Sequence, residues 1–260
     1  IAILLPGLQD AREQAKRVVC RSNLAQVNKG LVAYVIDLDS FPIRMSYTPS
    51  GFPTWCTWSY GGWTGKNTAY WQEHVGGTFF YHTTQRPLSV YMQFPGTLSE
   101  DEALAHFKCP NDEPGLAELF DPGAGQALSQ WSSYDDVGTS YRLNMRRWFD
   151  QMMNDPECAS LSSADRRECA MELGRLLWKR KLVDDPGRFV TLLEEPANFG
   201  LFNEIQTVGW HKQFSRHVTA FLDGHVDYVY TDTRYDRGRD WTVVDEDRPH
   251  VEPPGAGPPP

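Results

Sequence analysis

The most informative part of the chain for its fold is the N-terminal segment Leu4-Leu-Pro-Gly-Leu-Gln-Asp-Ala-Arg-Glu-Gln-Ala-Lys-Arg-Val-Val-Cys-Arg-Ser-Asn-Leu-Ala-Gln26. The residues that follow continue it to Asp37-Leu-Asp-Ser-Phe-Pro42. Small or apolar residues recur at alternating spacings of three and four, at Leu8, Ala11, Ala15, Val18, Ser22 and Ala25. This spacing places them in one helical stripe. The other faces carry the charged residues Arg12, Glu13, Lys16, Arg17 and Arg21. A second stripe begins where the first ends and contains Leu24, Val27, Leu31, Val35 and Leu38.

Two offset stripes predict one long helix with two partners. We expect the lower stripe to pack on another molecule and the upper stripe on the chain's own globular domain. The alternative is an ordinary amphipathic helix lying on a core.

An apolar stub, Ile1 to Leu5, precedes Pro6. A bilayer span needs about twenty apolar residues, so this stub cannot cross a membrane as it stands. We therefore expect that the chain begins partway along a longer hydrophobic helix. Pro6 has two open interpretations: a kink that a filament core lined with helices absorbs, or a residue in the first turn of a soluble helix.

Four pieces of the chain together resemble a known family. They are the N-terminal segment with Tyr34 and Asp37 to Pro42, then Phe107-Lys-Cys-Pro-Asn-Asp112, Thr139-Ser-Tyr-Arg-Leu-Asn144, and Arg216-His-Val-Thr-Ala-Phe-Leu-Asp-Gly-His-Val226. In this order they resemble pilin-like proteins with a prepilin cleavage and methylation signal, the pseudopilins of type II secretion and the type IV pilus subunits. Two features depart from the family: the basic leader, cleavage junction and early Glu are missing, and the loop between His217 and Asp223 is short.

The resemblance implies an α+β, pilin-like fold, with a long N-terminal helix packed on an antiparallel sheet and an aromatic-rich insertion. It implies a structural subunit, not an enzyme, in a helical filament of identical copies, with other pilin-like subunits and the assembly machinery as partners. The subunit would be anchored in the inner membrane before assembly and extracellular or periplasmic afterwards. The expected assembly helix surface contains Leu4, Leu5, Pro6, Leu8, Ala11, Ala15, Val18, Ser22 and Ala25.

Composition and length limit the alternatives. The 260 residues carry a net charge of −9, and 13 % of them are aromatic, which argues against disorder and against nucleic-acid binding. We expect a spine helix over residues 1–40, a globular domain over 41–247, and a disordered Pro/Gly-rich tail over 248–260.

The five cysteines allow at most two disulfides and leave one thiol. Cys158 and Cys169 bracket a short charged segment and are expected to form a local bridge. Cys20 and Cys109 lie in two of the family-like motifs, so the resemblance suggests a second bridge between them, although Cys56 competes for Cys109. The cysteine spacings match no zinc pattern, and reduced structural thiols remain an alternative.

Residues 52–81 are dense in aromatic side chains set among Gly, Thr and Ser. Trp55, Trp58, Trp63 and Trp71 could stack on sugar rings, which is the basis of an alternative function as a surface carbohydrate-binding or adhesive module. The competing interpretation is that these rings fill the core or a subunit contact.

The sequence pattern of the C-terminal third predicts one helix followed by several strands. Helical pattern runs from about Ser162 to Lys181 and ends at Asp184-Asp-Pro-Gly187. Strand-like runs follow at Arg188 to Glu194, at Val218 to Leu222 and at His225 to Tyr230. Asp223-Gly224 joins the last two and predicts a hairpin with a type I′ turn.

Two hypotheses of metal binding arise in the same region. His211, His217, Asp223 and His225 are ligand-type residues close together in the sequence, and a metal-dependent hydrolase would rest on this cluster. A metal would bind if the hairpin placed His217 beside His225. Asp232, Asp236 and Asp240 recur every four residues and could bind calcium, as the resemblance also suggests, but Arg234, Arg237 and Arg239 between them favour a salt-bridged loop. No nucleophile, phosphate-loop or dinucleotide motif is present in the sequence, and no cofactor is expected.

Overall fold

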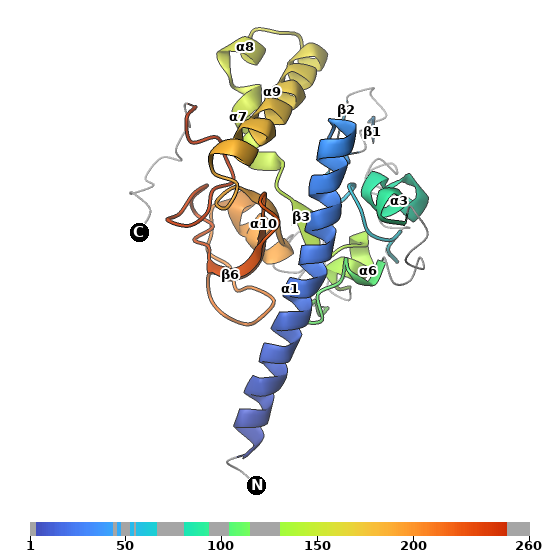
Figure 1. The fold of residues 1–260 in the computed structure, drawn as a ribbon, viewed down its shortest axis with the longest axis vertical. Helices are drawn as coiled ribbons and strands as arrows, with labels where there is room; N and C mark the ends of the chain where they lie inside the picture. The colour runs from blue at the N-terminus through green and yellow to red at the C-terminus, as the bar shows by residue number, and fades with distance from the viewer. Residues whose placement is uncertain are drawn as a thin grey trace.

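The computed structural model describes residues 4–43, 46–47, 53–54, 56–66, 81–93, 104–114 and 131–248. Within these residues the fold is α+β, with a long N-terminal helix lying against a four-stranded antiparallel sheet (Figure 1). The elements, in chain order, are α1 Leu4–Leu38, β1 Ser46–Tyr47, β2 Pro53–Thr54, η1 Thr83–Gln85, α3 Pro87–Gln93, α6 Ser133–Val137, β3 Tyr141–Leu143, α7 Arg146–Met153, α8 Pro156–Ala159, α9 Ser163–Asp184, β4 Val190–Glu194, α10 Glu195–Asn203, β5 Arg216–Phe221 and β6 Val226–Tyr230.

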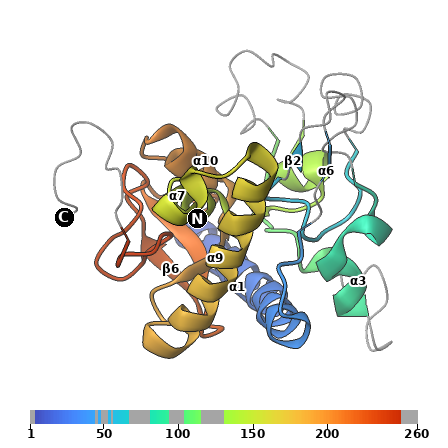
Figure 2. The same cartoon turned by 90° about the horizontal axis from the view of Figure 1, so that it is seen from above.

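Helix α1 is one continuous rod of 35 residues, about 50 Å long at 1.5 Å per residue. Its lower end projects beyond the domain, and its upper end reaches α9 (Figures 1 and 2). Pro6 lies in the first described turn and is exposed, so both interpretations of this proline stay open. Among the described helices, none is both long and apolar enough to span a bilayer.

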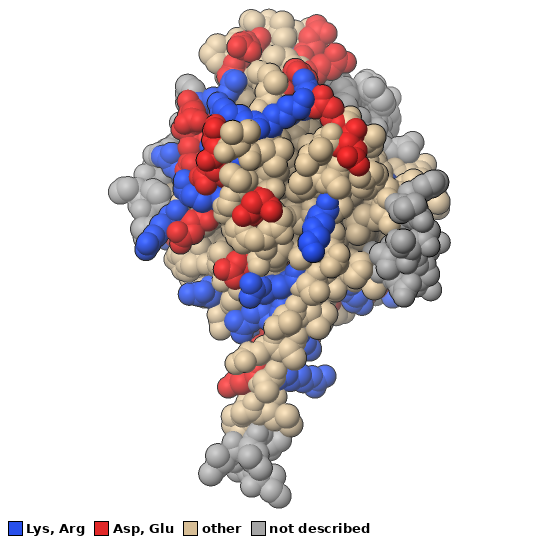
Figure 3. Space-filling view, viewed as in Figure 1, with Lys and Arg blue, Asp and Glu red and all other residues tan. Residues whose placement is uncertain are grey.

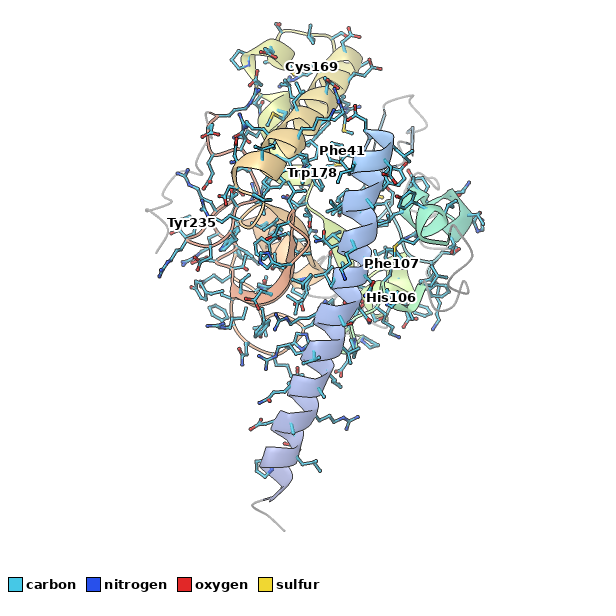
Figure 4. The ribbon with its side chains drawn as sticks, in the orientation of Figure 1. Phe41, His106, Phe107, Cys169, Trp178 and Tyr235 are labelled. Carbon is cyan, nitrogen blue, oxygen red and sulfur yellow. A yellow bond between two sulfur atoms is a disulfide. The ribbon has the colours of Figure 1, made fainter. Side chains whose placement is uncertain are left out.

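The upper stripe of α1 enters the core as expected, with one exception. Leu24, Val27, Leu31 and Val35 are buried, but Leu38 is 53 % exposed. Leu38 is the last residue of the helix, and Phe41 in the following turn fills the core there. The Phe41 ring lies 5.1 Å from that of Trp148 and 5.0 Å from that of Trp178 (Figure 4).

The sheet has the order β3-β4-β5-β6, and every neighbouring pair is antiparallel. One face packs on α1 through Leu192, Val218 and Ala220. The other face is covered by α10 and by the C-terminal segment, with Leu201, Trp241, Val243 and Val244. An irregularity in the register between Val190 and Leu192 lets these two residues join opposite cores, although an unbroken strand would point them the same way.

The hairpin predicted at Asp223-Gly224 is confirmed, but the predicted type I′ turn is wrong. Only Gly224 has a positive φ, of 93°, whereas a type I′ turn needs two such residues. The amide of Phe221 donates to the carbonyl of His225, which leaves a three-residue loop that closes with a left-handed glycine. Asp223 instead accepts a hydrogen bond from the His225 amide at 3.0 Å, which stabilises the turn without positive φ.

Helices α7, α8 and α9 form the upper lobe of the domain (Figure 1). The Ser162 side chain caps α9 by accepting a hydrogen bond from the Asp165 amide, and the predicted helix therefore starts where expected. The predicted disulfide between Cys158 and Cys169 is present and joins α8 to α9. At the end of α1, the Asp39 carboxylate lies 2.7 Å from Lys179 Nζ and 2.6 Å from Arg175 Nη1.

Candidate functional site

Four side chains from four separate segments meet beneath α1, and we call them the thiol–histidine cluster: Cys20, Cys109, Glu194 and His211. Cys20 lies on α1, Cys109 in the loop after residue 107, Glu194 at the end of β4, and His211 in the connection from α10 to β5. All four are buried. One ligand-type atom from each lies within 4.8 Å of the other three.

The distances within the cluster are short and even. Cys20 Sγ lies 3.9 Å from Glu194 Oε1, and Cys109 Sγ lies 3.9 Å from His211 Nε2. His211 Nε2 lies 3.6 Å from Glu194 Oε1. The cluster thus brings ligand atoms of three chemical types, sulfur, nitrogen and oxygen, within 4.8 Å of one another.

Backbone and side-chain hydrogen bonds hold each member in place. The Cys109 amide donates to Ser140 Oγ at 2.9 Å, which joins its loop to the start of β3. The Tyr141 hydroxyl lies 3.2 Å from Cys20 Sγ. The Trp210 amide donates to Glu194 Oε2 at 3.2 Å, which leaves Oε1 turned toward the cluster.

His211 has an acidic partner on the side away from the cluster. Glu13 Oε1, from the lower half of α1, lies 2.8 Å from His211 Nδ1, and Asn111 Nδ2 donates to the same oxygen at 2.6 Å. A carboxylate on Nδ1 favours the tautomer that carries its proton there, which leaves the Nε2 lone pair facing the cluster. Glu13 therefore orients His211 without belonging to the cluster.

Burial and mutual contacts shift the ionisation of the two thiols in opposite directions. Burial raises the pKa of the Cys20 thiol well above its ordinary value, and the neighbouring Cys109 raises it further. Burial also acts to raise the pKa of Cys109, but hydrogen bonds with Cys20 and His211 outweigh it and lower that pKa. Burial acts to lower the pKa of His211, and its contacts with Cys109 and Glu194 outweigh that effect and raise the pKa. The two thiols therefore differ in acidity, although both are buried and lie side by side.

The bridge suggested between Cys20 and Cys109 is not formed, although the two side chains are neighbours. Both cysteines are free thiols, with Cys20 Sγ next to Glu194 and Cys109 Sγ next to His211. Cys56, expected to be free, is free and buried. The sequence does not connect Glu194 and His211 with Cys20 and Cys109, because nothing in their local spacing marks them as partners of distant cysteines.

The histidines of the hairpin do not come together. His217 is fully buried on β5 and pairs with Val229 across the strands, not with His225. His225 lies on the exposed side, with its Nδ1 2.6 Å from Asp223 Oδ1 and its ring stacked 4.3 Å from that of Phe221. The strand register separates the two rings, so His217, Asp223 and His225 do not meet at one site in this structure.

The three aspartates considered for calcium are engaged by arginines. Asp232 accepts from the Arg234 side chain at 2.9 and 2.7 Å, and Asp236 lies 3.0 Å from Arg147 Nε. Asp240 is exposed, 3.7 Å from Arg239 Nε. This part of the chain has the contacts of a salt-bridged loop, the alternative that the interleaved arginines favoured.

Two of the four tryptophans considered for glycan stacking lie in the described residues, and both face the domain. The Arg142 guanidinium lies over the Trp58 ring at 5.3 Å, and Trp63 stacks on Tyr134 at 5.6 Å. These contacts favour packing over sugar binding. Trp55 and Trp71 lie outside the described residues.

The lower half of α1 presents a second candidate surface, which we call the outer stripe: Leu8, Ala11, Ala15, Val18 and Ser22. All five are exposed, Leu8 to 68 % and Val18 to 65 %. Three charged residues of the same segment contact the domain instead: Glu13 lies on His211, Lys16 lies 3.8 Å from Glu113, and the Arg17 guanidinium lies over the Tyr228 ring at 4.5 Å. Figure 3 shows the lower helix standing clear of the domain with an uncharged strip along the viewed face.

Comparison with protein-family models, with curated proteins and with solved structures finds no match to this chain.

Proposed function

We propose that this chain is a structural subunit of a type IV pilus-like or pseudopilus filament, assembling through its N-terminal helix. The observation that carries the proposal is the orientation of α1. Below Cys20 the helix turns Glu13, Lys16 and Arg17 toward its own domain and leaves the outer stripe uncovered.

This orientation is the reverse of an ordinary surface helix, whose apolar stripe faces the core and whose charges face water. A monomer gains nothing from exposing Leu8 and Val18 on a rod that projects beyond its domain. A second helix laid along the outer stripe would cover both residues. The small side chains of Ala11, Ala15 and Ser22 would let the two backbones approach closely.

The energy available is sufficient for a repeated contact. Burying a few hundred Å² of apolar surface at about 25 cal/mol per Å² contributes several kcal/mol per contact, before the cost of association. Contacts between the stripe and a different face of a neighbour are heterologous, and they generate an open helical polymer when the rotation between subunits does not close into a ring. Other pilin-like subunits and an assembly machinery would share this surface.

The resemblance of the sequence to pilin-like proteins supports the same assignment and supplies the rest of the proposal. The subunit would be held in the inner membrane before assembly and become part of an extracellular or periplasmic filament afterwards. The long helix packed on an antiparallel sheet is consistent with that class of protein.

The test uses one substitution at three positions. Val18→Glu places a charge on the outer stripe, where it should abolish self-association and leave the thermal melt of the domain unchanged. Leu31→Glu places the same charge in the core, since Leu31 is fully buried, and should unfold the domain. Val183→Glu is the matched control, because Val183 is 83 % exposed on α9, away from the stripe.

Sedimentation of the purified chain at rising concentration, with electron microscopy of the sedimenting species, measures assembly, and circular dichroism measures folding. We expect filaments with wild type and Val183→Glu, and folded monomers with Val18→Glu. Val18→Glu and wild type behaving alike in sedimentation would rule out the outer stripe as the assembly surface.

A further inference from the structure

The thiol–histidine cluster has no assigned role in a filament contact, because it lies inside the subunit. Its members come from α1, β4 and two loops, so whatever holds them together also holds the projecting helix to the sheet. We propose that Cys20, Cys109, Glu194 and His211 bind a structural zinc ion that clamps α1 to the domain. This inference is independent of the filament proposal.

The ligand types favour zinc. Thiolate sulfur, imidazole nitrogen and carboxylate oxygen are its usual protein ligands, and two thiolates among four ligands favour it over the hard cations magnesium and calcium. The four protein ligands leave no open position for water or substrate. Structural zinc sites are closed in this way, whereas catalytic sites keep one position free.

The size of the cluster agrees with a tetrahedral ion. Zinc bonds of about 2.3 Å to sulfur and about 2.0 Å to nitrogen or oxygen place neighbouring tetrahedral ligands roughly 3.3 to 3.8 Å apart. The observed separations are 3.9 Å for Cys20 to Glu194, 3.9 Å for Cys109 to His211 and 3.6 Å for His211 to Glu194. A contraction of a few tenths of an ångström brings these three pairs to the separations of a tetrahedral site, and the other three pairs lie within 4.8 Å.

The surroundings are those of a metal site rather than of a chance cluster. His211 presents Nε2 to the cluster while Glu13 accepts at Nδ1, the carboxylate–histidine arrangement that accompanies zinc ligands. The Trp210 amide and the Tyr141 hydroxyl contact Glu194 and Cys20. Without an ion, by contrast, Glu194 is a fully buried acid whose hydrogen-bond and ion-pair partners include no Lys or Arg among the described residues.

Metal content of the full chain, purified under reducing conditions without chelator, is the first measurement. We expect one zinc per chain in wild type and in Cys56→Ser, whose buried free cysteine lies outside the cluster. Cys109→Ser and His211→Gln should lose the ion. Cobalt added to the metal-free wild type should give the thiolate charge-transfer band of a tetrahedral site, and Cys109→Ser should not show it.

If the variants of the ligand residues do not fold, zinc binding can be tested with a variant that leaves all four ligands in place. Glu13→Gln removes the charge behind His211 from a partly exposed helix position and should weaken zinc affinity roughly tenfold to a hundredfold. Glu113→Gln is its control, because this carboxylate contacts the same helix through Lys16. Added zinc should raise the melting temperature of the metal-free wild type and of Glu113→Gln.

Two results would overturn the proposal. One is a wild-type chain that takes up no zinc and melts at the same temperature with and without added zinc. The other is peptide mapping of the native protein that recovers Cys20 linked to Cys109 as a disulfide, because linked sulfur atoms cannot serve as two thiolate ligands.

Discussion

Replacement of Gly174 by alanine is a sensitive test of how α9 packs on α7. A Cβ added at Gly174 would lie 2.6 Å from Cη2 and 2.8 Å from Cε3 of Trp148, and closer still to Cζ3. The Trp148 ring is fully buried, donates its indole N–H to the Asn144 carbonyl and packs against Phe41. The ring therefore has to move by about 1 Å in a close-packed core.

Two effects of opposite sign compete in this variant. Alanine inside a helix stabilises by about 0.8 to 1 kcal/mol relative to glycine. Overpacking of a rigid core costs about 1 to 3 kcal/mol. Because the neighbour is a buried aromatic ring held by its contacts, we expect the cost of overpacking to exceed the gain in helix propensity by about 1 to 2 kcal/mol. That loss lowers the melting temperature by roughly 2 to 8 °C for a domain of this size.

Gly30→Ala in α1 is the matched comparison. There the added Cβ would meet Met92, at 2.9 Å from Cγ and 3.0 Å from Sδ. A methionine side chain can rotate away, so the helix-propensity gain should prevail and the melt should be unchanged or higher. Thermal melts followed by circular dichroism, with near-ultraviolet spectra for the tryptophans, separate the two variants. Equal stabilisation by Gly174→Ala and Gly30→Ala would refute the packing of Trp148 against α9.

Two further predictions concern the upper lobe. Lys179 and Arg175 hold the pKa of Asp39 below its ordinary value of 3.8, so this carboxylate stabilises the fold above that pH and the contribution is lost as pH falls through the lowered value. Asp39→Asn should melt slightly below wild type at pH 7 and level with it in acid; a difference that persists in acid would contradict the ion-pair explanation. Replacing Cys158 and Cys169 together by serine opens a loop of 11 residues and should cost about 3 kcal/mol in denaturant unfolding. Reducing agent should lower the stability of wild type to that of the double variant, and no effect of reduction would contradict a formed bridge.

The local sequence pattern was sufficient to predict several structural elements of this protein. The two stripes of α1, the start of α9 at its Ser162 cap, the Asp223-Gly224 hairpin and the Cys158 to Cys169 bridge all follow from residues close in sequence. Each depends on helical period, capping, turn preference or short loop closure, which are short-range effects. The turn type was missed because both I′ and three-residue loops accept a glycine at the same place.

The tertiary structure alone decided which side of α1 meets the domain. Spacing tells which residues share a face, but it does not tell that Glu13 and Arg17 turn inward below Cys20. The same holds for the thiol–histidine cluster, whose four members are brought together by strand order, by the end of β4 and by two loops. No local spacing encodes a contact between Cys20 and His211, because the long-range packing of helix on sheet creates it.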